Sequence, residues 1–515
     1  MVTFAALVAL LAIFATPLWQ GARALLNGDS QTLQAAKPSD RLTTNKTPAD
    51  NPLIPATGTI GGQSASTQTQ QAPPASQTLQ ASKPSDRLTT NKTQGNIPLA
   101  PPTIGIAVAS GVEPSANAQA QNAPPLPISR PLGQEPKSIN SPVRGVTDTE
   151  IRFGISAPFS GAAKELGQNM KVGIEAAFNV ANARGGVHGR QLRLIAADDG
   201  YEPTRTAETM KQLYERDQVF GLVGNVGTPT AVVALPYSLE RKMLFFGAFT
   251  GANLLRSDPP DRYVFNYRAS YAEETDAVVR YLVKVRRLKP KQIAVFAQQD
   301  AYGDAGFAGV AKAMRSLRGG GESTILRLNY KRNTVNVDEA VEQLKKSRIP
   351  IKAVIMVPAY RAAAKFIEKT RDLYPTMIYT SVSFVGSTAL ASELMLLGKK
   401  YAAGVIVTQV VPAVDGHSSL VLDYKSALAK YFPGEAPDYV SLEGYVAANV
   451  LIEALKRNGA QLDTETLVET LEKLHDLDIG LGTLVIFSRS EHQGVHKVWG
   501  SQLDATGHYQ PIDLQ

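Results

Sequence analysis

Short apolar runs alternate with helix-length amphipathic stretches from residue 151 onward. The runs read IRFGISAPF, QLRLIAADD, VFGLVGNV, MLFFGAF, QIAVFAQQD, AVIMVP and GVIVTQVV, and they are typical of buried strands. Apolar positions at helical spacing mark residues 166–181, 272–286 and 439–457. This alternation predicts an α/β domain of βαβ units, with parallel sheets covered by helices on both faces. Because residues 151–515 are too many for a single sheet with its covering helices, we expect two lobes.

The residues just after the apolar runs are the candidates for chemistry, because ligands of such sheets bind at the carboxyl ends of the strands. They are Ser160, Thr228, Thr250, Asp300–Tyr302, Tyr360 and Ser383. Hydroxyl groups and phenols dominate this set, and Asp300 is its only carboxylate. The pattern therefore favours binding of a small polar molecule.

Within LVGNVGTPTAVVALP, the spacing predicts Thr228 as the N-cap of a helix and Pro229 as its first residue. The amides of that first turn would then face the strand ends, with the positive pole of the helix behind them, and such a site suits a carboxylate. Most threonines in such a position only cap their own helix, and this motif alone favours that interpretation of Thr228 while leaving the binding interpretation open. FTGANLL at residues 249–255 repeats the arrangement at the next strand and favours the binding interpretation.

No pattern in the sequence supports an enzyme, a cofactor or a metal. A Gly-x-Ser-x-Gly elbow and a phosphate-binding loop ending in Gly-Lys-Ser/Thr are both absent. His492 and His496 are four residues apart, but Gly494 and a strand-like context between them are untypical of zinc ligands. The pair Asp198-Asp199 is more typical of a turn or a cap than of acid–base chemistry. We therefore expect a binding protein with no cofactor.

The chain has no cysteine, which excludes disulfides, thiol nucleophiles and a lipid-modified N-terminal cysteine. Its formal net charge of +7 is mild for 515 residues, and no basic stripe is interleaved with aromatic residues. Nucleic acid is therefore not an expected partner.

Residues 25–150 have the composition of a disordered linker. Seventeen of the 32 prolines lie between positions 28 and 150, and no aromatic residue occurs between positions 20 and 152. Such a segment buries too little apolar area to offset its chain entropy. An 18-residue motif, SQTLQAAKPSDRLTTNKT, starts at Ser30 and recurs from Ser76 with one change. Duplication of a spacer explains the repeat, and a short recognition tag is the alternative.

Residues 1–24 form the other N-terminal segment, an apolar helix that is either a transmembrane anchor or a signal. Positions 2–19 are nearly all apolar and just long enough to cross a bilayer. No Lys or Arg precedes them, which is unusual for a signal peptide, although Ala22-Arg23-Ala24 resembles a cleavage site. We favour an uncleaved anchor in the inner membrane, with cleavage and export as the alternative.

Several motifs of the globular part resemble a known family. Residues 160–206 read SGAAKELGQNMKVGIEAAFNVANARGGVHGRQLRLIAADDGYEPTRT, and GNVGTPT, FFGAFTGANLL, QQDAYGDAG and SFVGSTAL follow. This ordered set resembles the leucine/isoleucine/valine-binding protein family, the type I periplasmic substrate-binding proteins of ABC transporters. The resemblance implies two Rossmann-like lobes joined by a hinge and closing on a small molecule. Lobe 1 would span about 151–270 and 400–485, and lobe 2 about 271–399 and 486–515.

The resemblance also implies ligand contacts in the first lobe. Thr228 matches the hydroxyl that holds the ligand's α-carboxylate, and Val226 and Gly227 match the wall beside it. Ala248 and Thr250 match the contacts at the end of the next strand. The carboxylate-binding end of the site is therefore expected to be kept.

The second lobe departs from the family's pattern for amino acids. Tyr302 and Tyr360 match the aromatic residues brought down on closure. However, Leu166 stands where an aromatic residue usually covers the ligand, and Ser383 stands where an acid usually pairs with the ligand's ammonium. A buried ammonium without a partner charge is costly. Either Asp300 supplies that charge or the ligand is not a plain α-amino acid.

The function expected from the sequence is extracytoplasmic capture of a small carboxylate-bearing solute, delivered to an ABC permease. The alternative is a membrane-tethered sensor or regulatory scaffold that uses the same fold, which the single anchor and long spacer would favour. The expected location is periplasmic, with residues 2–19 holding the protein to the cytoplasmic membrane.

Overall fold

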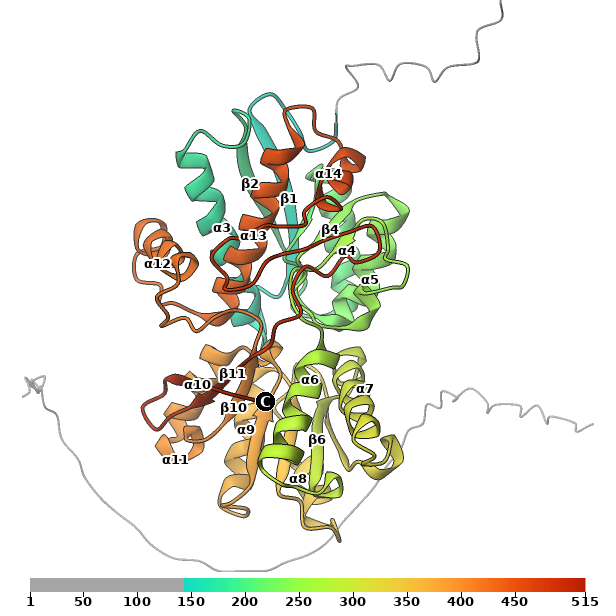
Figure 1. The fold of residues 1–515 in the computed structure, drawn as a ribbon, viewed down its shortest axis with the longest axis vertical. Helices are drawn as coiled ribbons and strands as arrows, with labels where there is room; N and C mark the ends of the chain where they lie inside the picture. The colour runs from blue at the N-terminus through green and yellow to red at the C-terminus, as the bar shows by residue number, and fades with distance from the viewer. Residues whose placement is uncertain (1–142, 515) are drawn as a thin grey trace, which may run out of the picture. The chain divides into compact units, whose positions relative to one another are not determined.

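The computed structural model describes residues 143–514, which contain one parallel and one mostly parallel sheet with helices on their faces (Figure 1). We call the five-stranded sheet and its helices the first lobe, and the seven-stranded sheet and its helices the second lobe. This is the α/β architecture that the alternating pattern predicts. The predicted anchor and most of the predicted linker lie outside the described residues. Within the described residues, no helix is long and apolar enough to cross a membrane.

The sheet of the first lobe has the strand order β2-β1-β3-β4-β5, and all its pairs are parallel. Its strands are β1 (Glu150–Ala157), β2 (Gln191–Asp198), β3 (Gly221–Val223), β4 (Leu244–Phe246) and β5 (Val264–Phe265). Ile151, Phe153 and Ile155 of β1 are buried on one face. The carboxyl ends of β3 and β4, where Thr228 and Thr250 follow, are adjacent because these strands pair directly.

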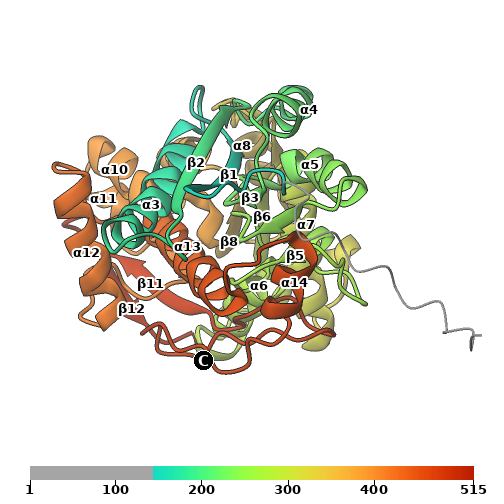
Figure 2. The ribbon, with the colours of Figure 1, turned by 90° about the horizontal axis from the view of Figure 1, so that it is seen from above.

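The helices of the first lobe come from both ends of the described chain. They are α3 (Lys164–Ala183), α4 (Pro203–Lys211), α5 (Thr228–Glu240), α12 (Ser419–Tyr431), α13 (Tyr439–Asn458) and α14 (Thr464–Leu471). Figures 1 and 2 show α3 and α13 side by side, although more than two hundred residues separate them. A Cβ on Gly173 would lie 1.8 Å from the carbonyl oxygen of Ser441, so the two backbones touch.

The sheet of the second lobe has the order β12-β11-β10-β9-β8-β6-β7. Its strands are β6 (Ile293–Gln298), β7 (Arg327–Tyr330), β8 (Ala353–Val357), β9 (Ile378–Ser381), β10 (Ile406–Gln409), β11 (Trp499–Leu503) and β12 (Tyr509–Ile512). The strands from β7 to β10 are parallel, whereas β11 and β12 are antiparallel additions at one edge. The expected parallel pairing holds from β7 to β10, and this edge differs because β11 and β12 form a hairpin that needs no crossover helix.

Six helices cover the second sheet. They are α6 (Tyr271–Arg280), α7 (Ala301–Ser316), α8 (Asp338–Lys345), α9 (Tyr360–Arg371), α10 (Ser387–Leu397) and α11 (Lys399–Ala402). The first of them, α6, begins with a capping box, in which the Ser270 hydroxyl accepts from the amide of Glu273 and the Glu273 carboxylate accepts from the amide of Ser270. It starts directly after the first crossing between lobes, so the cap fixes where the second lobe begins.

The lobe boundaries differ from those expected. The second lobe continues past residue 399, because β10 pairs in register with β9. Residues 486–495 remain with the first lobe: the Phe487 ring packs edge-on against Phe265, and His492 stacks on Phe265 at 3.8 Å. The last segment of the second lobe begins only at β11. At the hinge, the amide of Asn266 donates to the His492 carbonyl at 2.8 Å, which ties two crossing segments together.

The ordered domain also begins earlier than the expected residue 151. The Arg144 guanidinium lies 3.5 Å from the centre of the Tyr214 ring, and the amide of Arg152 donates to the carbonyl of Gly145. Gly145 has φ +75°, and a Cβ there would lie 2.1 Å from the amide nitrogen of Phe220. Residues 143–149 therefore pack on the domain, although their composition resembles that of the linker.

Candidate functional site

Thr228 and Thr250 meet where β3 and β4 end, with their Oγ1 atoms 2.7 Å apart and both side chains fully buried. The expectation that Thr228 caps the helix was wrong. Gly227, with φ +107°, takes the N-cap position, so Thr228 is the first helical residue of α5 and its side chain caps nothing. Its hydroxyl is therefore directed to Thr250 and not to its own helix.

Val226, Gly227 and Ala248, the predicted wall residues, are all buried at the ends of the same two strands. Val226 forms a parallel bridge with Phe249, so the two strand ends continue side by side beyond the sheet. A Cβ on Gly227 would lie 2.3 Å from a ring atom of Tyr201. Glycine at 227 thus allows both the left-handed backbone and the close approach of the Tyr201 ring.

Tyr302 and Tyr360, the two predicted aromatic contacts of the second lobe, lie in the first turns of α7 and α9 and are buried. The Tyr302 hydroxyl donates to the Pro358 carbonyl at 3.4 Å. Leu166 of the first lobe reaches the same region, because a Cβ on Gly386 would lie 2.6 Å from its Cδ2 and 3.8 Å from a ring atom of Tyr360. Side chains from both lobes therefore meet at the predicted cleft.

Asp300 does not present a free carboxylate to this cleft. It is the N-cap of α7, and one carboxylate oxygen accepts from the amide of Tyr302 at 3.0 Å. The other oxygen accepts from Gln298 at 2.8 Å and from Arg332 at 2.9 Å. Both oxygens are thus engaged by the protein itself, and this argues against Asp300 as the partner of a ligand ammonium.

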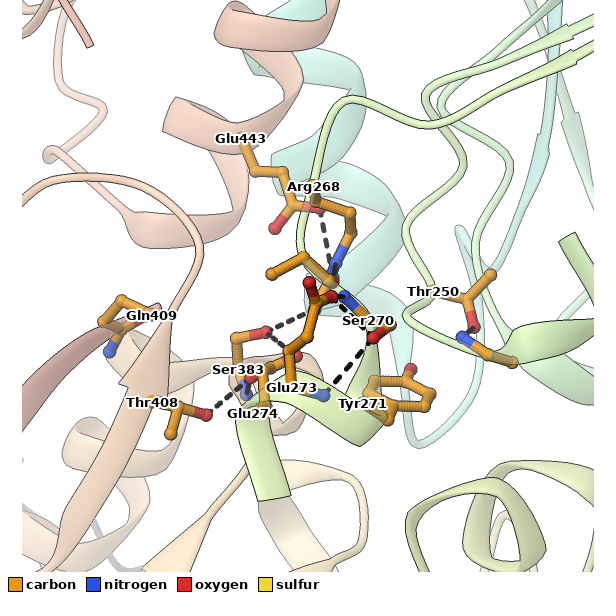
Figure 3. A network of polar contacts seen from close by, with 12 residues as sticks. Thr250, Arg268, Ser270, Tyr271, Glu273, Glu274, Ser383, Thr408, Gln409 and Glu443 are labelled. Atoms are coloured by element: carbon orange, nitrogen blue, oxygen red, sulfur yellow. Dashed lines mark hydrogen bonds and ion pairs between the residues drawn. The ribbon is translucent and has the colours of Figure 1, made fainter. Parts of the chain in front are cut away.

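Ser383 belongs to a buried network of charges between the lobes (Figure 3). Its hydroxyl lies 2.6 Å from Nη2 of Arg268 and 3.1 Å from Glu274, and its amide donates to Glu274 at 2.8 Å. Arg268 also pairs with Glu274 at 2.7 Å and with Glu443 of α13 at 3.1 Å. Thr408 donates the fourth hydrogen bond to Glu274, at 2.5 Å. The network joins the crossing segment, α6, α13 and the second sheet.

The electrostatics of this network follow from burial and from the charge pairs. Burial opposes the charge on Arg268, but Glu443 and Glu274 outweigh it and raise the pKa of the guanidinium above its ordinary value. Burial raises the pKa of Glu443 to about 7, against the effect of Arg268. Arg268 therefore stays charged, and burial makes Glu443 easier to protonate than an ordinary glutamate.

An aromatic cluster fills the space beside the threonine pair. The Phe384 ring of the second lobe stacks on Phe249 of the first lobe, with centroids 4.9 Å apart and planes at 27°. It lies 4.6 Å from Tyr302, 6.2 Å from Tyr201 and 6.4 Å from Tyr271. All five rings are at most 1% exposed. The lobes are therefore in direct contact at the predicted site.

Sequence reasoning missed Arg268, Glu274, Glu443, Tyr201 and Phe384. The first three lie within a crossing segment or a helix, and nothing in the sequence shows that their side chains converge. Phe384 directly follows Ser383, which the strand-end rule selected, and Tyr201 lies two residues after Asp199, which was considered for a turn or a cap. Extending that rule by one or two positions would have found both.

The other titratable candidates have structural roles. His496 lies 2.6 Å from Glu273 and His492 is stacked on Phe265, so the two histidines face different partners. Asp198 accepts from the amides of Phe159 and Gly200, which agrees with the predicted turn role. Within residues 143–514, no group of three or more His, Asp or Glu side chains could hold a metal ion.

Residues 150–508 match the family described as periplasmic binding protein. A solved structure of a possible leucine/isoleucine/valine-binding protein from Rhodopirellula baltica is 40% identical, with a TM-score of 0.68, and covers 73% of this chain and 98% of its own. The Leu/Ile/Val-binding protein homolog 3 of Brucella melitensis is 26% identical over 65% of this chain and 86% of its own length. A branched-chain amino acid ABC transporter protein from Thermus thermophilus, solved with bound valine, is 16% identical with a TM-score of 0.60, over 71% of this chain and 96% of its own. This last similarity concerns the fold alone.

Proposed function

This chain belongs to the periplasmic binding protein family, and from that membership we propose that it captures a small carboxylate-bearing solute between its two lobes for an ABC-type importer. Proteins of this family bind solutes, and binding without catalysis is the proposal here. The location that follows is extracytoplasmic. The ligand would be an amino acid or a related compound, because the relatives named above are described as leucine, isoleucine and valine binders.

The observation that carries the proposal is the pair of buried hydroxyls at Thr228 and Thr250. They lie at the carboxyl ends of two adjacent strands, where ligands of parallel sheets bind. Thr228 also begins the first turn of α5, and the positive pole at a helix N-terminus favours an anion. Two adjacent hydroxyls beside a helix N-terminus suit a carboxylate that takes the place of their mutual hydrogen bond, and Phe384 of the opposite lobe stacks on Phe249 next to Thr250.

Substitution of Thr228 by Val tests the carboxylate site. Valine keeps the branched shape but removes the hydroxyl, so it deletes a hydrogen bond to a charged group worth about 1.5–3 kcal/mol. We expect the affinity of the full-length protein for a carboxylate ligand to fall about ten- to a hundredfold. The measurement is isothermal titration with a panel of amino acids and short carboxylic acids, alongside the melting temperature.

Thr230→Val is the matched control. The Thr230 hydroxyl lies on the same helix and is also buried, but it donates to the Val226 carbonyl at 2.6 Å. Both variants should lose stability because each leaves a buried polar group unpaired. Only Thr228→Val should lose affinity. Equal affinities of the two variants for the ligand would refute the proposed role of Thr228.

The second candidate is a membrane-tethered sensor or scaffold. It is favoured by direct contacts between the lobes, such as Arg332 of the second lobe pairing with Glu202 of the first at 2.8 Å. A domain whose two lobes close by contacting each other's side chains suits signalling to a partner protein. Attachment to the cytoplasmic membrane through residues 2–19 is part of either proposal. Crosslinking in intact cells distinguishes them, since a transporter should be captured with a permease and a sensor with another membrane protein.

A further inference from the structure

The Phe384 ring lies between the residues that the two lobes were expected to bring to a ligand. On one side it stacks at 4.9 Å on Phe249, which is flanked by the predicted contacts Ala248 and Thr250. On the other side it lies 4.6 Å from Tyr302, the predicted contact of the second lobe. The ring thus takes up part of the space that these contacts enclose.

The position of this ring is fixed by its surroundings. Phe384 is fully buried, and Ser383 before it is held by Arg268 and Glu274. Gly386, two residues later, has φ +80° and packs against Leu166, so the segment turns sharply after the ring. A side chain held on both flanks in this way behaves as part of the wall of the site, because moving it disturbs several buried contacts.

The carboxylates near the ring are already fully engaged. Glu274 accepts from Arg268, from the Ser383 amide and hydroxyl, and from Thr408. Asp300 accepts from its own helix and from Arg332. A ligand ammonium placed beside Ser383 would therefore find a hydroxyl but no free negative charge, and burying an unpaired ammonium is costly.

We propose that Phe384 is a specificity-determining residue that restricts this cleft to a small carboxylate without an ammonium group, such as propionate. The ring takes the volume that a branched side chain needs, and Ser383 offers no charge to an amine. This inference rests on the proposed function, because it takes the carboxylate to bind at Thr228 and Thr250.

The test compares three probes that separate size from charge: propionate, 4-methylpentanoate and L-leucine. The second has the carbon skeleton of leucine without its ammonium. The full-length parent should bind propionate most tightly. Phe384→Ala should bind 4-methylpentanoate about ten- to a hundredfold more tightly than the parent does, because a branched apolar group can then be buried. L-Leucine should remain weaker than 4-methylpentanoate in both proteins.

Phe366→Ala is the matched control, because the Phe366 ring is equally buried and stacks on Phe296 at 4.2 Å inside the second lobe. It should cost stability without changing the preference among the probes. Phe384→Leu, which keeps most of the apolar contact, is the second variant and should give a smaller gain.

Two results would overturn the inference. A parent that prefers L-leucine would refute both the size limit and the exclusion of an ammonium, and a Phe384→Ala variant that folds and binds propionate but gains nothing for 4-methylpentanoate would refute the size limit. Both results would leave the proposed function intact. Failure of every protein to bind any of the three probes would refute the carboxylate site as well. Loss of propionate binding in Thr228→Val would uphold that site independently of Phe384.

Discussion

Asp199 is a fully buried carboxylate that holds a residue of the site in place. It accepts from the Tyr201 amide at 2.9 Å, from the Ser156 hydroxyl at 3.0 Å and from the Thr206 hydroxyl at 3.1 Å. Tyr201 has φ +62°, a backbone conformation that is rare outside glycine, and its ring packs over Gly227 and near Phe384. The Asp199 carboxylate therefore stabilises a backbone conformation of Tyr201 that residues other than glycine rarely adopt.

The charge on Asp199 should make stability depend on pH. Burial raises its pKa from 3.8 to about 6, against the effect of its hydrogen bonds. Between these values the folded state binds the proton more tightly than the unfolded state, so the free energy of unfolding falls as pH rises. Relative to Asp199→Asn, the parent should lose up to about 3 kcal/mol between roughly pH 4 and pH 7. Denaturant unfolding at both values measures this.

Asp198→Asn is the control with the opposite sign. Burial would raise the pKa of Asp198, but hydrogen bonds from the Ser160 hydroxyl and the Phe159 amide lower it to about 2. The stability that Asp198 contributes is fully present above the pKa that this residue has in the unfolded chain, and it is lost as pH falls toward 2. If the parent and Asp199→Asn showed parallel pH profiles, burial would not govern the protonation of Asp199.

The residue scale also shows where sequence reasoning ends. The strand-end rule selected Thr228, Thr250 and Tyr302 because each lies one or two residues after an apolar run. It could not find Arg268, which pairs with Glu443, 175 residues away, because no local pattern encodes that contact. The Thr-Pro pair predicted an N-cap at Thr228. The structure moves the N-cap one residue earlier, to Gly227, because the left-handed conformation of that glycine leaves no signal in an apolar pattern.

At the scale of elements, long periodic segments and apolar runs were predicted well, and short segments without an apolar run were not. The spacing predicted a helix over 439–457, and α13 spans Tyr439–Asn458. The hairpin of β11 and β12 was missed because its residues are only partly buried and form no apolar run. The four residues of β9 include Thr380 and Ser381, so they resemble a loop in the sequence although the surrounding strands bury them.

The contact between α3 and α13 depends on glycines at the crossing point. A Cβ on Gly173 would lie 1.8 Å from the Ser441 carbonyl oxygen, and a Cβ on Gly444 would lie 2.5 Å from the Met170 carbonyl oxygen. Gly173→Ala should therefore force the helices apart and destabilise the protein by about 3 kcal/mol or more, at the upper end for overpacking, because backbone cannot move aside as a side chain can. Thermal unfolding measures the change.

Lys171→Ala, two residues earlier on α3, serves as the comparison. It removes a half-buried partner of Glu175 at 2.6 Å and should change stability by less than about 1 kcal/mol. Equal melting temperatures for Gly173→Ala and Lys171→Ala would show that the helices can separate at little cost.

At the scale of the whole domain, the described lobes are joined by the hinge and by polar contacts between their facing surfaces. The Gln298 amide donates to the Tyr201 hydroxyl at 3.2 Å, and Asn333 donates to Glu202 at 2.7 Å. Arg332 binds both lobes, through Glu202 of the first at 2.8 Å and Asp300 of the second at 2.9 Å. The number of lobes could be predicted from length, but these contacts could not, because they join loops whose relative positions depend on closure.

Arg332→Gln should weaken ligand binding without touching the ligand. If the ligand binds the closed form, removing a contact that exists only on closure lowers the population of that form and reduces affinity. Because the pairs are partly exposed, each contributes about 0.2–1 kcal/mol, so we expect a two- to roughly fivefold weaker binding of propionate in titration calorimetry. The difference in affinity between Arg332→Gln and the parent should shrink at about 1 M salt, which screens exposed charges.

Arg327→Gln is the control. Its pairing with Asp304 at 2.6 Å lies within the second lobe, so this variant should leave affinity unchanged. Tighter binding by Arg332→Gln would mean that the contact holds the lobes in a form that excludes the ligand, as the sensor proposal would require.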